Sequence, residues 1–340
     1  MSKKRALVIC PGRGTYNKEE LGYFGRNHPD QQAMLAAFDD KRRALGQTPL
    51  AELDQAARYA LSSHSRGDNA SALIYACALA DYRAINRDQY DITAITGNSM
   101  GWYIALACAG ACDAETGFDI VNTMGTMMQQ SLIGGQLLYP FVDENWVEIP
   151  GKRAELLALT EQIEGLYVSI HLGGMVVFAG LDQALRQAEQ ALPPVQGRFP
   201  MRLQNHAGFH SVLQQPNSQK ALAEIPTDWL TPPQHPMIDG RGHIWYPGAN
   251  RQEDIHRYTF GTQVVETYDF TRAVQNSLKE FAPEVVIVLG PGNTLGGAVA
   301  QAMIDLNWQG MSCKADFQKR QQAAPLLLAM GLPEQRAMVL

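Results

Sequence analysis

Residues 91–109 read DITAITGNSMGWYIALACA. The β-branched run 91–96 predicts a short buried strand, and the apolar run 102–109 predicts a buried helix. The pentapeptide between them, Gly97-Asn98-Ser99-Met100-Gly101, has the pattern G-x-S-x-G. A strand, this pattern and a helix in succession form the context of a nucleophile elbow, a sharp turn that exposes a serine hydroxyl. We therefore predict that Ser99 is a nucleophile rather than a serine in an ordinary tight turn.

The residues around Ser99 also suit nucleophilic chemistry. The flanking glycines let the backbone turn sharply and leave room beside the hydroxyl. The start of the following helix presents backbone N–H groups and the positive end of the helix dipole to an oxyanion. The sequence thus predicts both a nucleophile and a place for the negative charge that its attack creates.

Bulk properties exclude several classes of function. The chain has 340 residues, enough for one large domain with an insertion or for two domains. Its net charge of −6 and pI near 5.8 give no electrostatic footprint for nucleic acid. No apolar run is long enough to cross a membrane, and the run before Pro11, about five residues, is too short for a signal peptide. We expect neither a nucleic-acid partner nor a membrane partner.

The cysteines favour a reducing compartment. They stand at positions 10, 77, 108, 112 and 313 and show neither C-x-x-C nor zinc-ligand spacing. Cys108 and Cys112 lie four residues apart on the predicted helix, where two buried thiols are expected rather than a disulfide. We therefore predict no metal site and a cytoplasmic location.

The order of the predicted elements indicates a parallel sheet. Strands alternate with helices in the first part of the chain, and a strand that we expect to be fully buried returns near its end. This alternation is typical of a parallel sheet covered by helices on both faces. Residues 226–247 read as a loop-rich connection. The predicted elements are strands at 5–10, 91–96 and 284–289 and helices at 31–45, 50–64, 69–84 and 114–133.

The stretch that follows Gly134-Gly135 has a different pattern. Its elements run β-α-β-β-α-β, which is the ferredoxin-like order. We therefore predict a large catalytic α/β domain of residues 1–135 and 204–340, with an inserted ferredoxin-like subdomain of residues 136–203. The elements of the insertion are strands at 136–142, 167–171, 175–179 and 198–203 and helices at 152–163 and 182–191.

A nucleophilic serine needs a base within hydrogen-bond reach. The candidates are the eight histidines, at positions 28, 64, 171, 206, 210, 235, 243 and 256. Periodicity does not choose among them.

Six short segments, taken in order along the chain, carry a resemblance that does choose. They are Pro11-Gly-Arg-Gly-Thr15, Gly97 to Gly101, Gly173-Gly-Met-Val-Val-Phe-Ala-Gly180, Asn205-His-Ala-Gly-Phe-His-Ser-Val-Leu213, Gln263-Val-Val-Glu-Thr-Tyr268 and Gly290-Pro-Gly-Asn-Thr-Leu295. They resemble P-G-Q-G-S, G-H-S-x-G, P-G-Q-V-V-I-A-G, A-F-H-S-x-L, Q-x-x-x-P-V and G-P-G-x-x-L of the malonyl-CoA:acyl-carrier-protein transacylases and related acyltransferase domains. The resemblance implies a large α/β-hydrolase-like parallel-sheet domain with an inserted ferredoxin-like subdomain, in agreement with the element order.

The resemblance also implies roles for individual residues. Ser99 would attack a thioester carbonyl and become acylated, and His210 would take its proton and later return one to the departing thiol. In this family a carbonyl oxygen orients the base, and Gln263 stands where that support is expected. The backbone N–H groups of Met100 and Arg13 would hold the oxyanion.

The implied substrates are a coenzyme A thioester and the phosphopantetheine thiol of an acyl carrier protein. The resemblance therefore points to a cytoplasmic acyltransferase of fatty acid or polyketide biosynthesis, with acyl-CoA and the carrier protein as partners. No permanently bound cofactor is expected.

One departure from the family concerns the acyl group. Members that handle malonyl groups have an arginine in a segment R-G-x-x-M-Q, where it grips the free carboxylate; Met124 occupies that position here. A thioether would leave a buried carboxylate unpaired, so the substitution favours a neutral acyl group. Alternatively, Arg13, which replaces the family's glutamine, supplies the missing charge from the opposite wall. Both accounts remain open at the level of sequence.

Other expected pocket positions also differ from the family. Asn98 replaces a histidine beside the nucleophile, Trp102 replaces a glutamate and His171 replaces an asparagine. Because the Ser–His pair is kept, this pattern predicts a retained reaction with an altered acyl group.

Three other functions compete with acyl transfer. A thioester hydrolase would use the same acyl-serine with water as the acceptor. An ordinary α/β-hydrolase esterase would need a histidine near the chain end, whereas the last one is His256. A non-catalytic module that docks carrier proteins would not need both Ser99 and His210.

Overall fold

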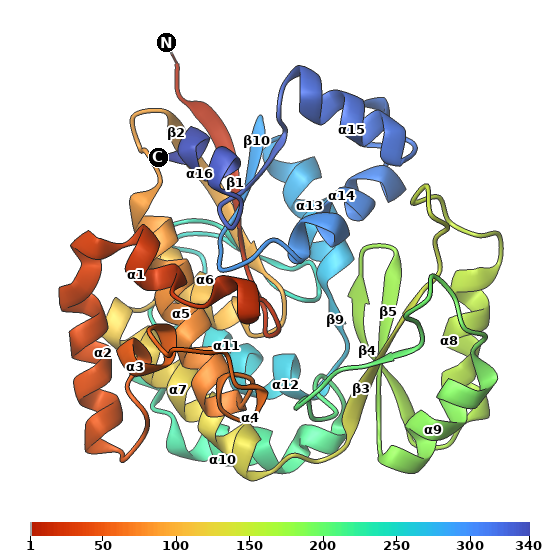
Figure 1. Ribbon diagram of the computed structural model, residues 1–340, viewed down its shortest axis with the longest axis horizontal. Helices are drawn as coiled ribbons and strands as arrows, with labels where there is room; N and C mark the ends of the chain where they lie inside the picture. The colour runs from red at the N-terminus through yellow and green to blue at the C-terminus, as the bar shows by residue number, and fades with distance from the viewer. Residues whose placement is uncertain (1) are drawn as a thin grey trace.

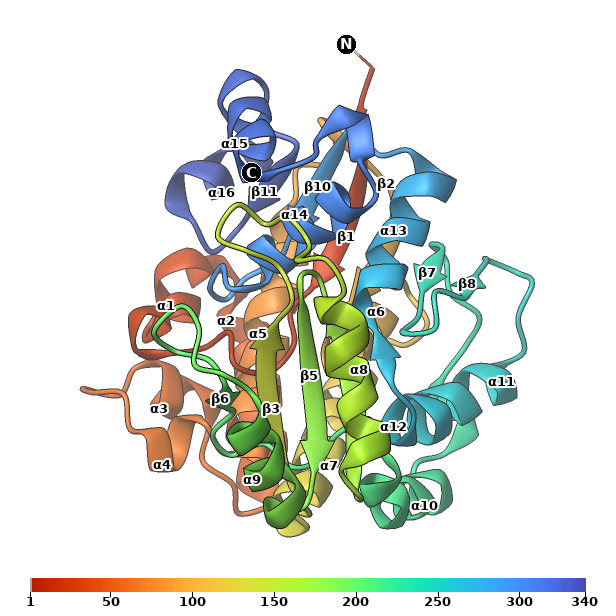
Figure 2. The ribbon, with the colours of Figure 1, turned by 90° about the vertical axis from the view of Figure 1, so that its right-hand side faces the viewer.

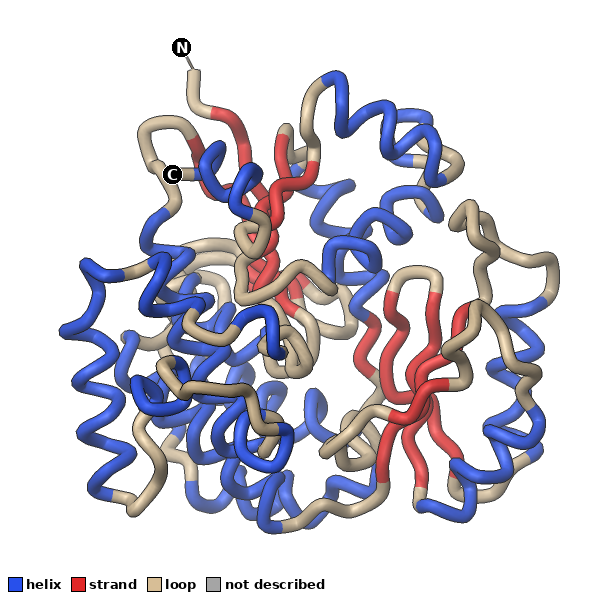
Figure 3. The backbone as a smooth tube through the Cα atoms, in the orientation of Figure 1, coloured by secondary structure: helices blue, strands red, loops and turns tan. Residues whose placement is uncertain are grey.

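The computed structural model describes residues 2–340 and places the strands in two separate sheets (Figures 1 and 3). The first sheet has the strand order β11-β10-β1-β2-β7-β8. Neighbouring strands are parallel except β7 and β8, which are antiparallel. The strands are β1 (Lys4–Cys10), β2 (Tyr90–Gly97), β7 (Met237–Ile238), β8 (Ile244–Trp245), β10 (Val285–Val288) and β11 (Leu327–Ala329).

Continuous apolar strands form the centre of the first sheet. Residues 6–10 of β1 and all of β10 are buried, as expected for a parallel sheet that is covered on both faces. Helix α6 packs on β1 and β2, and α5 packs on α7. The helices before the second sheet are α1 (Tyr23–Asn27), α2 (Gln32–Ala44), α3 (Leu50–Asp54), α4 (Leu61–His64), α5 (Gly67–Ala84), α6 (Gly101–Cys108) and α7 (Ala114–Gln130).

The second sheet has the order β6-β3-β5-β4-β9. Its first four strands pair antiparallel, and β9 pairs parallel with β4. Helices α8 and α9 cover its outer face (Figure 2). The elements are β3 (Gly135–Pro140), α8 (Lys152–Gln162), β4 (Leu166–Leu172), β5 (Met175–Gly180), α9 (Asp182–Ala191), β6 (Met201–Arg202) and β9 (Tyr268–Asp269).

The last third of the chain joins the two sheets. Helix α13 contacts β2 of the first sheet and β4 of the second, so it lies between them (Figure 2). The helices of this part are α10 (Gln215–Glu224), α11 (Gln252–Arg257), α12 (Gln263–Val265), α13 (Phe270–Phe281), α14 (Leu295–Asp305), α15 (Lys314–Ala323) and α16 (Pro333–Val339).

The mixed α/β fold class is confirmed, and the segment 167–179 lies in the second sheet, as predicted. The elements from β3 to β6 follow the predicted order β-α-β-β-α-β. The sheet also takes β9 from outside residues 136–203. The division into domains at those boundaries stays a prediction.

Two local predictions were wrong. Residues 50–64 form two short helices, α3 and α4, and the imidazole of His64 donates to the carbonyl of Leu53 at 2.9 Å. A continuous helix would pair that carbonyl with the amide of residue 57. Residues 226–247, which read as a loop-rich connection without strands, contain β7 and β8; strands of two residues are too short to show a period.

The cysteines are free thiols, and those at positions 10, 77, 108 and 112 are buried, so Cys108 and Cys112 do not form a disulfide. Within residues 2–340, no helix has both the length and the apolar character that a membrane span requires.

Candidate active site

Ser99 lies at a strained turn between β2 and α6. Its φ angle is +57°, in the left-handed region that non-glycine residues rarely adopt. A Cβ atom at Gly97 would lie 2.3 Å from the backbone of Gly101, and one at Gly101 would lie 2.3 Å from the carbonyl oxygen of Cys10. Only glycine fits at these two positions, so the pattern read from the sequence is the steric requirement of this turn.

The turn brings Ser99 to His210. The Ser99 Oγ atom lies 2.7 Å from Nε2 of His210, and Nδ1 of the same ring lies 2.6 Å from the carbonyl oxygen of Gln263. Because a carbonyl can only accept, Nδ1 carries the proton and Nε2 is left to accept the hydroxyl proton of Ser99. Ser99 and His210 are therefore in position for proton transfer.

Gln263 supports both members of the pair. Its main-chain carbonyl holds His210, while its side-chain Nε2 donates to the carbonyl of Ser99 at 3.1 Å. The hydroxyl of Tyr103 donates to its Oε1 at 3.1 Å. The residue assigned from the resemblance thus holds the ring with its backbone and the elbow with its side chain.

Burial sets the protonation state of His210. The imidazole is almost completely buried, and this lowers its pKa to about 4, although the hydrogen bond to the Gln263 carbonyl opposes the shift. His210 is consequently neutral at physiological pH and can act as a base.

Sequence reasoning missed two tyrosines of the site. Tyr268 lies beside His210, with ring centroids 5.2 Å apart and ring planes tilted by 52°, and its hydroxyl donates to the carbonyl of Gly97 at 2.6 Å. Tyr103, described above, lies one helical turn after Ser99. For Tyr103 the available signal was a phenol hydroxyl in an otherwise apolar segment, since a buried Tyr O–H usually has a hydrogen-bond partner.

An inner cavity of about 50 Å³ opens beside Ser99. Its polar groups include Ser99, His210 and Arg13. This volume holds roughly a few water molecules, so the cavity suits a short acyl group. Its apolar wall consists of Met100, Val121, Met124, Met128, Phe209 and Val264.

A second cavity of about 340 Å³, called the outer cavity below, also adjoins Ser99. The loop at 12–15 and Asn98 line it on one side, and strands β3, β4 and β5 of the second sheet line it on the other. Ser99 therefore faces a small cavity and a larger cavity that reaches the second sheet.

Arg13 lines both cavities. Its Nη2 donates to the carbonyls of Ser65 at 3.0 Å and Asn205 at 2.9 Å, and its guanidinium lies 5.5 Å from the ring centre of Phe209. Its Nε and Nη1 are buried and have no hydrogen-bond partner. Burial lowers the pKa of Arg13 to about 10, so the side chain remains a cation at neutral pH.

The proposed oxyanion donors also line the inner cavity. Met100 is the residue before α6, and Arg13 lies in the loop after β1. The role of their N–H groups stays a prediction.

Three other predicted pocket residues have distinct placements. Met124 is buried in the wall of the inner cavity. Asn98 lines the outer cavity, and its Oδ1 is buried without a hydrogen-bond partner. Trp102 lines neither cavity: its indole donates to Thr259 Oγ1 at 3.0 Å and packs on Tyr258, which is a structural contact.

The placement of His171 corrects an expectation. Its neighbours on β4, Ile170 and Leu172, line the outer cavity, whereas His171 does not. Alternate residues of a strand point to opposite faces, so His171 points away from the cavity. There it lies near Asp269 and Arg272, and burial lowers its pKa. Sequence position alone did not reveal which face of β4 meets the site.

Comparison with known proteins agrees with the fold and with the resemblance. No family model matches the chain. The malonyl CoA-acyl carrier protein transacylase of Haemophilus influenzae is 22% identical over 328 residues, which cover 92% of this chain and 97% of that protein. This chain resembles the malonyl-CoA:acyl-carrier-protein transacylases over nearly its whole length. The resemblance inferred from the six segments is thereby confirmed, at an identity that marks a divergent chain.

Solved structures of such transacylases have the same fold. One from Xanthomonas oryzae matches with a TM-score of 0.76 and 17% identity over 99% of this chain and 98% of that one. Another, a malonyl-transacylase solved in complex with the acyl-carrier protein of a type II polyketide synthase, matches with a TM-score of 0.74 and 18% identity over 99% of both chains. Among residues 2–340, no three His, Cys, Asp or Glu side chains are grouped so as to hold a metal ion.

Proposed function

We propose that this protein is an acyltransferase that moves an acyl group from coenzyme A to the phosphopantetheine thiol of an acyl carrier protein through an acyl-Ser99 intermediate. The observation that carries the proposal is the continuous hydrogen-bonded arrangement from Ser99 Oγ through His210 to the carbonyl of Gln263. A nucleophile, a base and a group that orients the base are the elements of covalent acyl transfer.

In the first half-reaction, Ser99 Oγ attacks the thioester carbonyl while its proton moves to Nε2 of His210. The C–S bond then breaks, and the leaving sulfur takes the proton from Nε2 as coenzyme A departs. The Gln263 carbonyl keeps the Nδ1 proton in place throughout, and it stabilises the imidazolium that forms.

The second half-reaction reverses these steps with a new thiol. Nε2 of His210 takes the proton of the carrier's phosphopantetheine thiol, and the sulfur attacks the acyl-Ser99 carbonyl. The C–O bond breaks, and Oγ recovers its proton from Nε2. Backbone N–H groups of Met100 and Arg13 would stabilise the oxyanion in both halves.

The names of similar proteins support the choice of substrates. The Haemophilus influenzae relative is named for malonyl-CoA and acyl carrier protein, and one of the solved structures contains a carrier protein. We propose that the outer cavity accepts the pantetheine arm of either thiol. In that arrangement the predicted insertion, residues 136–203, forms one wall of the thiol channel.

Intact-protein mass spectrometry after mixing with a panel of acyl-CoAs tests the proposal. The expected result is a mass increase equal to one acyl group, located on Ser99, that disappears when holo acyl carrier protein is added. Ser99→Ala is the matched control and should gain no mass. Acylation of the Ala variant to the same extent would end the covalent mechanism.

Hydrolysis is the second candidate, because the outer cavity beside Ser99 has room for water. In a hydrolase the acyl-Ser99 mass would decay to the free acid without a carrier protein. Measuring free acid against acyl carrier protein product under the same conditions separates the two reactions.

A further inference from the structure

Desolvation lowers the pKa values of two arginines, Arg13 and Arg42, but only Arg42 is fully paired. Arg42 Nε donates to the carbonyl of Thr48 at 2.6 Å. Its Nη1 donates to the carbonyl of Asp68 and to Asn122 Oδ1, and its Nη2 contacts Asn69 Oδ1. Every nitrogen of the Arg42 guanidinium is therefore bonded within the protein. Arg42 therefore needs no ligand to satisfy its hydrogen-bond donors.

The guanidinium of Arg13, in contrast, is not fully hydrogen-bonded within the protein. Its two hydrogen bonds both leave from Nη2, while Nε and Nη1 are buried without a partner. An unpaired buried donor is costly, and more so on a charged group. Since Arg13 lines both cavities beside Ser99, the missing acceptor fits a ligand in those cavities.

The unpaired Nη1 of Arg13 lies near the part of α7 that carries Met124. A Cβ atom at Gly67 would lie 3.6 Å from Nη1 of Arg13 and 3.1 Å from the carbonyl oxygen of Gly125. Gly125 follows Met124 on α7, so the guanidinium reaches the wall on which Met124 stands. Arg13 and Met124 line the same inner cavity as Ser99.

We infer that Arg13 is a specificity-determining residue that binds the anionic oxygen of a short acyl group bearing a free carboxylate. The inference rests on the proposed acyl transfer. The carboxylate would accept hydrogen bonds from the N–H groups that the protein leaves unpaired. Arg13, in the loop after β1, then provides the positive charge that Met124 on α7 cannot supply.

A phosphate of coenzyme A offers the same anionic oxygens. The pantetheine arm, however, separates the phosphates from the thioester, and Arg13 lines the small cavity that contains the nucleophile. This placement favours the carboxylate of the acyl group. Thioesters of N-acetylcysteamine, which have no phosphate, distinguish the two sources.

The test compares acylation of Ser99 by malonyl and acetyl groups, each on coenzyme A and on N-acetylcysteamine. Arg13→Gln should lower the malonyl loading rate about 100-fold on both carriers, because a paired buried charge is lost. Acetyl loading should change by less than about threefold, since a neutral group does not use the cation. The malonyl-to-acetyl ratio is a readout that a purely structural arginine would not move.

Arg42→Lys is the matched control. It should lower the melting temperature, because the paired fork is replaced by a single ammonium, and leave the malonyl-to-acetyl ratio unchanged. Met124→Arg in the Arg13→Gln background should restore malonyl loading at least about tenfold, by returning a guanidinium to the same cavity. Should Arg13→Gln fail to fold, Arg13→Lys serves in its place, with a smaller loss expected in the same direction.

Several outcomes would overturn the inference while acyl transfer stands. One is a malonyl-to-acetyl ratio that Arg13→Gln leaves unchanged. Another is an equal loss of both acyl groups on coenzyme A alone, which would assign Arg13 to a phosphate. If no donor acylates Ser99 in the unmodified protein, the proposed function itself fails, and this result is distinct from the other two.

Discussion

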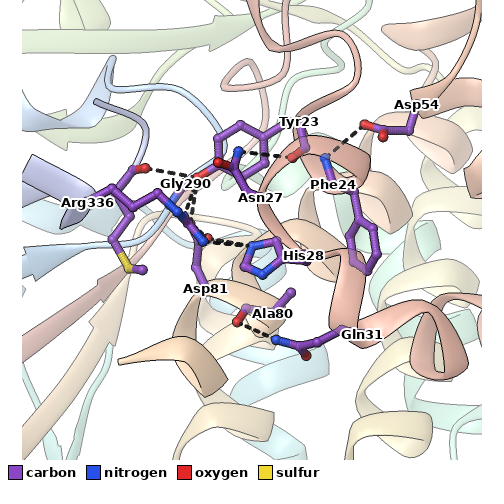
Figure 4. A network of polar contacts seen from close by, with 11 residues as sticks. Tyr23, Phe24, Asn27, His28, Gln31, Asp54, Ala80, Asp81, Gly290 and Arg336 are labelled. Carbon is purple, nitrogen blue, oxygen red and sulfur yellow. Dashed lines mark hydrogen bonds and ion pairs between the residues drawn. The ribbon is translucent and has the colours of Figure 1, made fainter. Parts of the chain in front are cut away.

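Two buried histidines of this protein are held in opposite ways. His210 bonds a neutral carbonyl on one side and faces the hydroxyl of Ser99 on the other. His28 bonds the carboxylate of Asp81 at 2.8 Å, and Arg336 pairs with the same carboxylate (Figure 4). The first ring adjoins a cavity, whereas the second lines neither of the two cavities at Ser99.

The cluster around Asp81 joins distant parts of the chain. Asp81 on α5 accepts from the hydroxyl of Tyr23 on α1 at 2.8 Å and from the amide of Gly290 at 2.7 Å, and it pairs with Arg336 on α16 (Figure 4). Its oxygens are fully used by the protein. The comparison teaches that a buried polar network is structural when every group is paired internally, and available for chemistry when a group faces a cavity.

The largest expected effect comes from removing Ser99 or His210, the pair that faces the cavity. Ser99→Ala should lower acyl transfer by at least about 10⁴-fold, and His210→Ala should do similar damage, because each removes a member of one catalytic unit. The double variant should be no slower than the worse single variant. Steady-state transfer to holo acyl carrier protein measures these rates, with circular dichroism as the folding control. Additive losses would mean that the two residues act independently.

The next largest effect is a loss of stability from changing Asp81, which holds the structural cluster together. Asp81→Asn should destabilise the fold by about 3–5 kcal/mol, because it leaves the Arg336 guanidinium buried without its counter-charge. Urea unfolding measures the change. The transfer rate per folded molecule should stay within about twofold, since Asp81 touches no part of the proposed site. A loss of rate comparable to that of His210→Ala would erase the distinction between the two histidines.

The pH dependence of stability tests whether burial holds His210 neutral. Burial lowers the pKa of His210 from 6.5 to about 4, so between these values the unfolded chain binds a proton that the folded chain does not. The stability that this group contributes is therefore full above pH 6.5 and is lost as the pH falls toward about 4.

Unfolding free energies of the protein and of His210→Gln across this pH range measure the contribution. The variant should show a shallower slope, and Ser99→Ala, which keeps the imidazole, serves as the control. The slope does not vanish, because burial also lowers the pKa of His206. Parallel curves for the protein and His210→Gln would mean that His210 is not held neutral.

The smallest expected effect concerns the support of Gln263. Tyr103→Phe removes one neutral hydrogen bond to its side-chain oxygen, which is worth about 0.5–1.5 kcal/mol. We expect transfer to slow by roughly two- to tenfold and the pH profile to remain unchanged. Tyr23→Phe, which removes a phenol hydroxyl from the Asp81 cluster, should lower stability instead of the transfer rate.

The sequence determined those features that depend on local sterics and chain order. A G-x-S-x-G pattern between an apolar strand and an apolar helix required the turn that presents Ser99, because a Cβ atom at either glycine would collide with backbone. The alternation of elements predicted the parallel sheet, and the β-α-β-β-α-β order predicted the second sheet. Resemblance in six ordered segments selected His210 from eight histidines.

Tertiary structure alone decided which groups are left without a partner. The sequence does not distinguish Arg13 from Arg42. The fold gives every guanidinium nitrogen of Arg42 a hydrogen-bond partner, but it leaves two nitrogens of Arg13 buried and unpaired. The face of β4 that His171 occupies was decided in the same way. Hydrogen bonding and burial arise from segments that lie far apart in the chain, so no local pattern reports them.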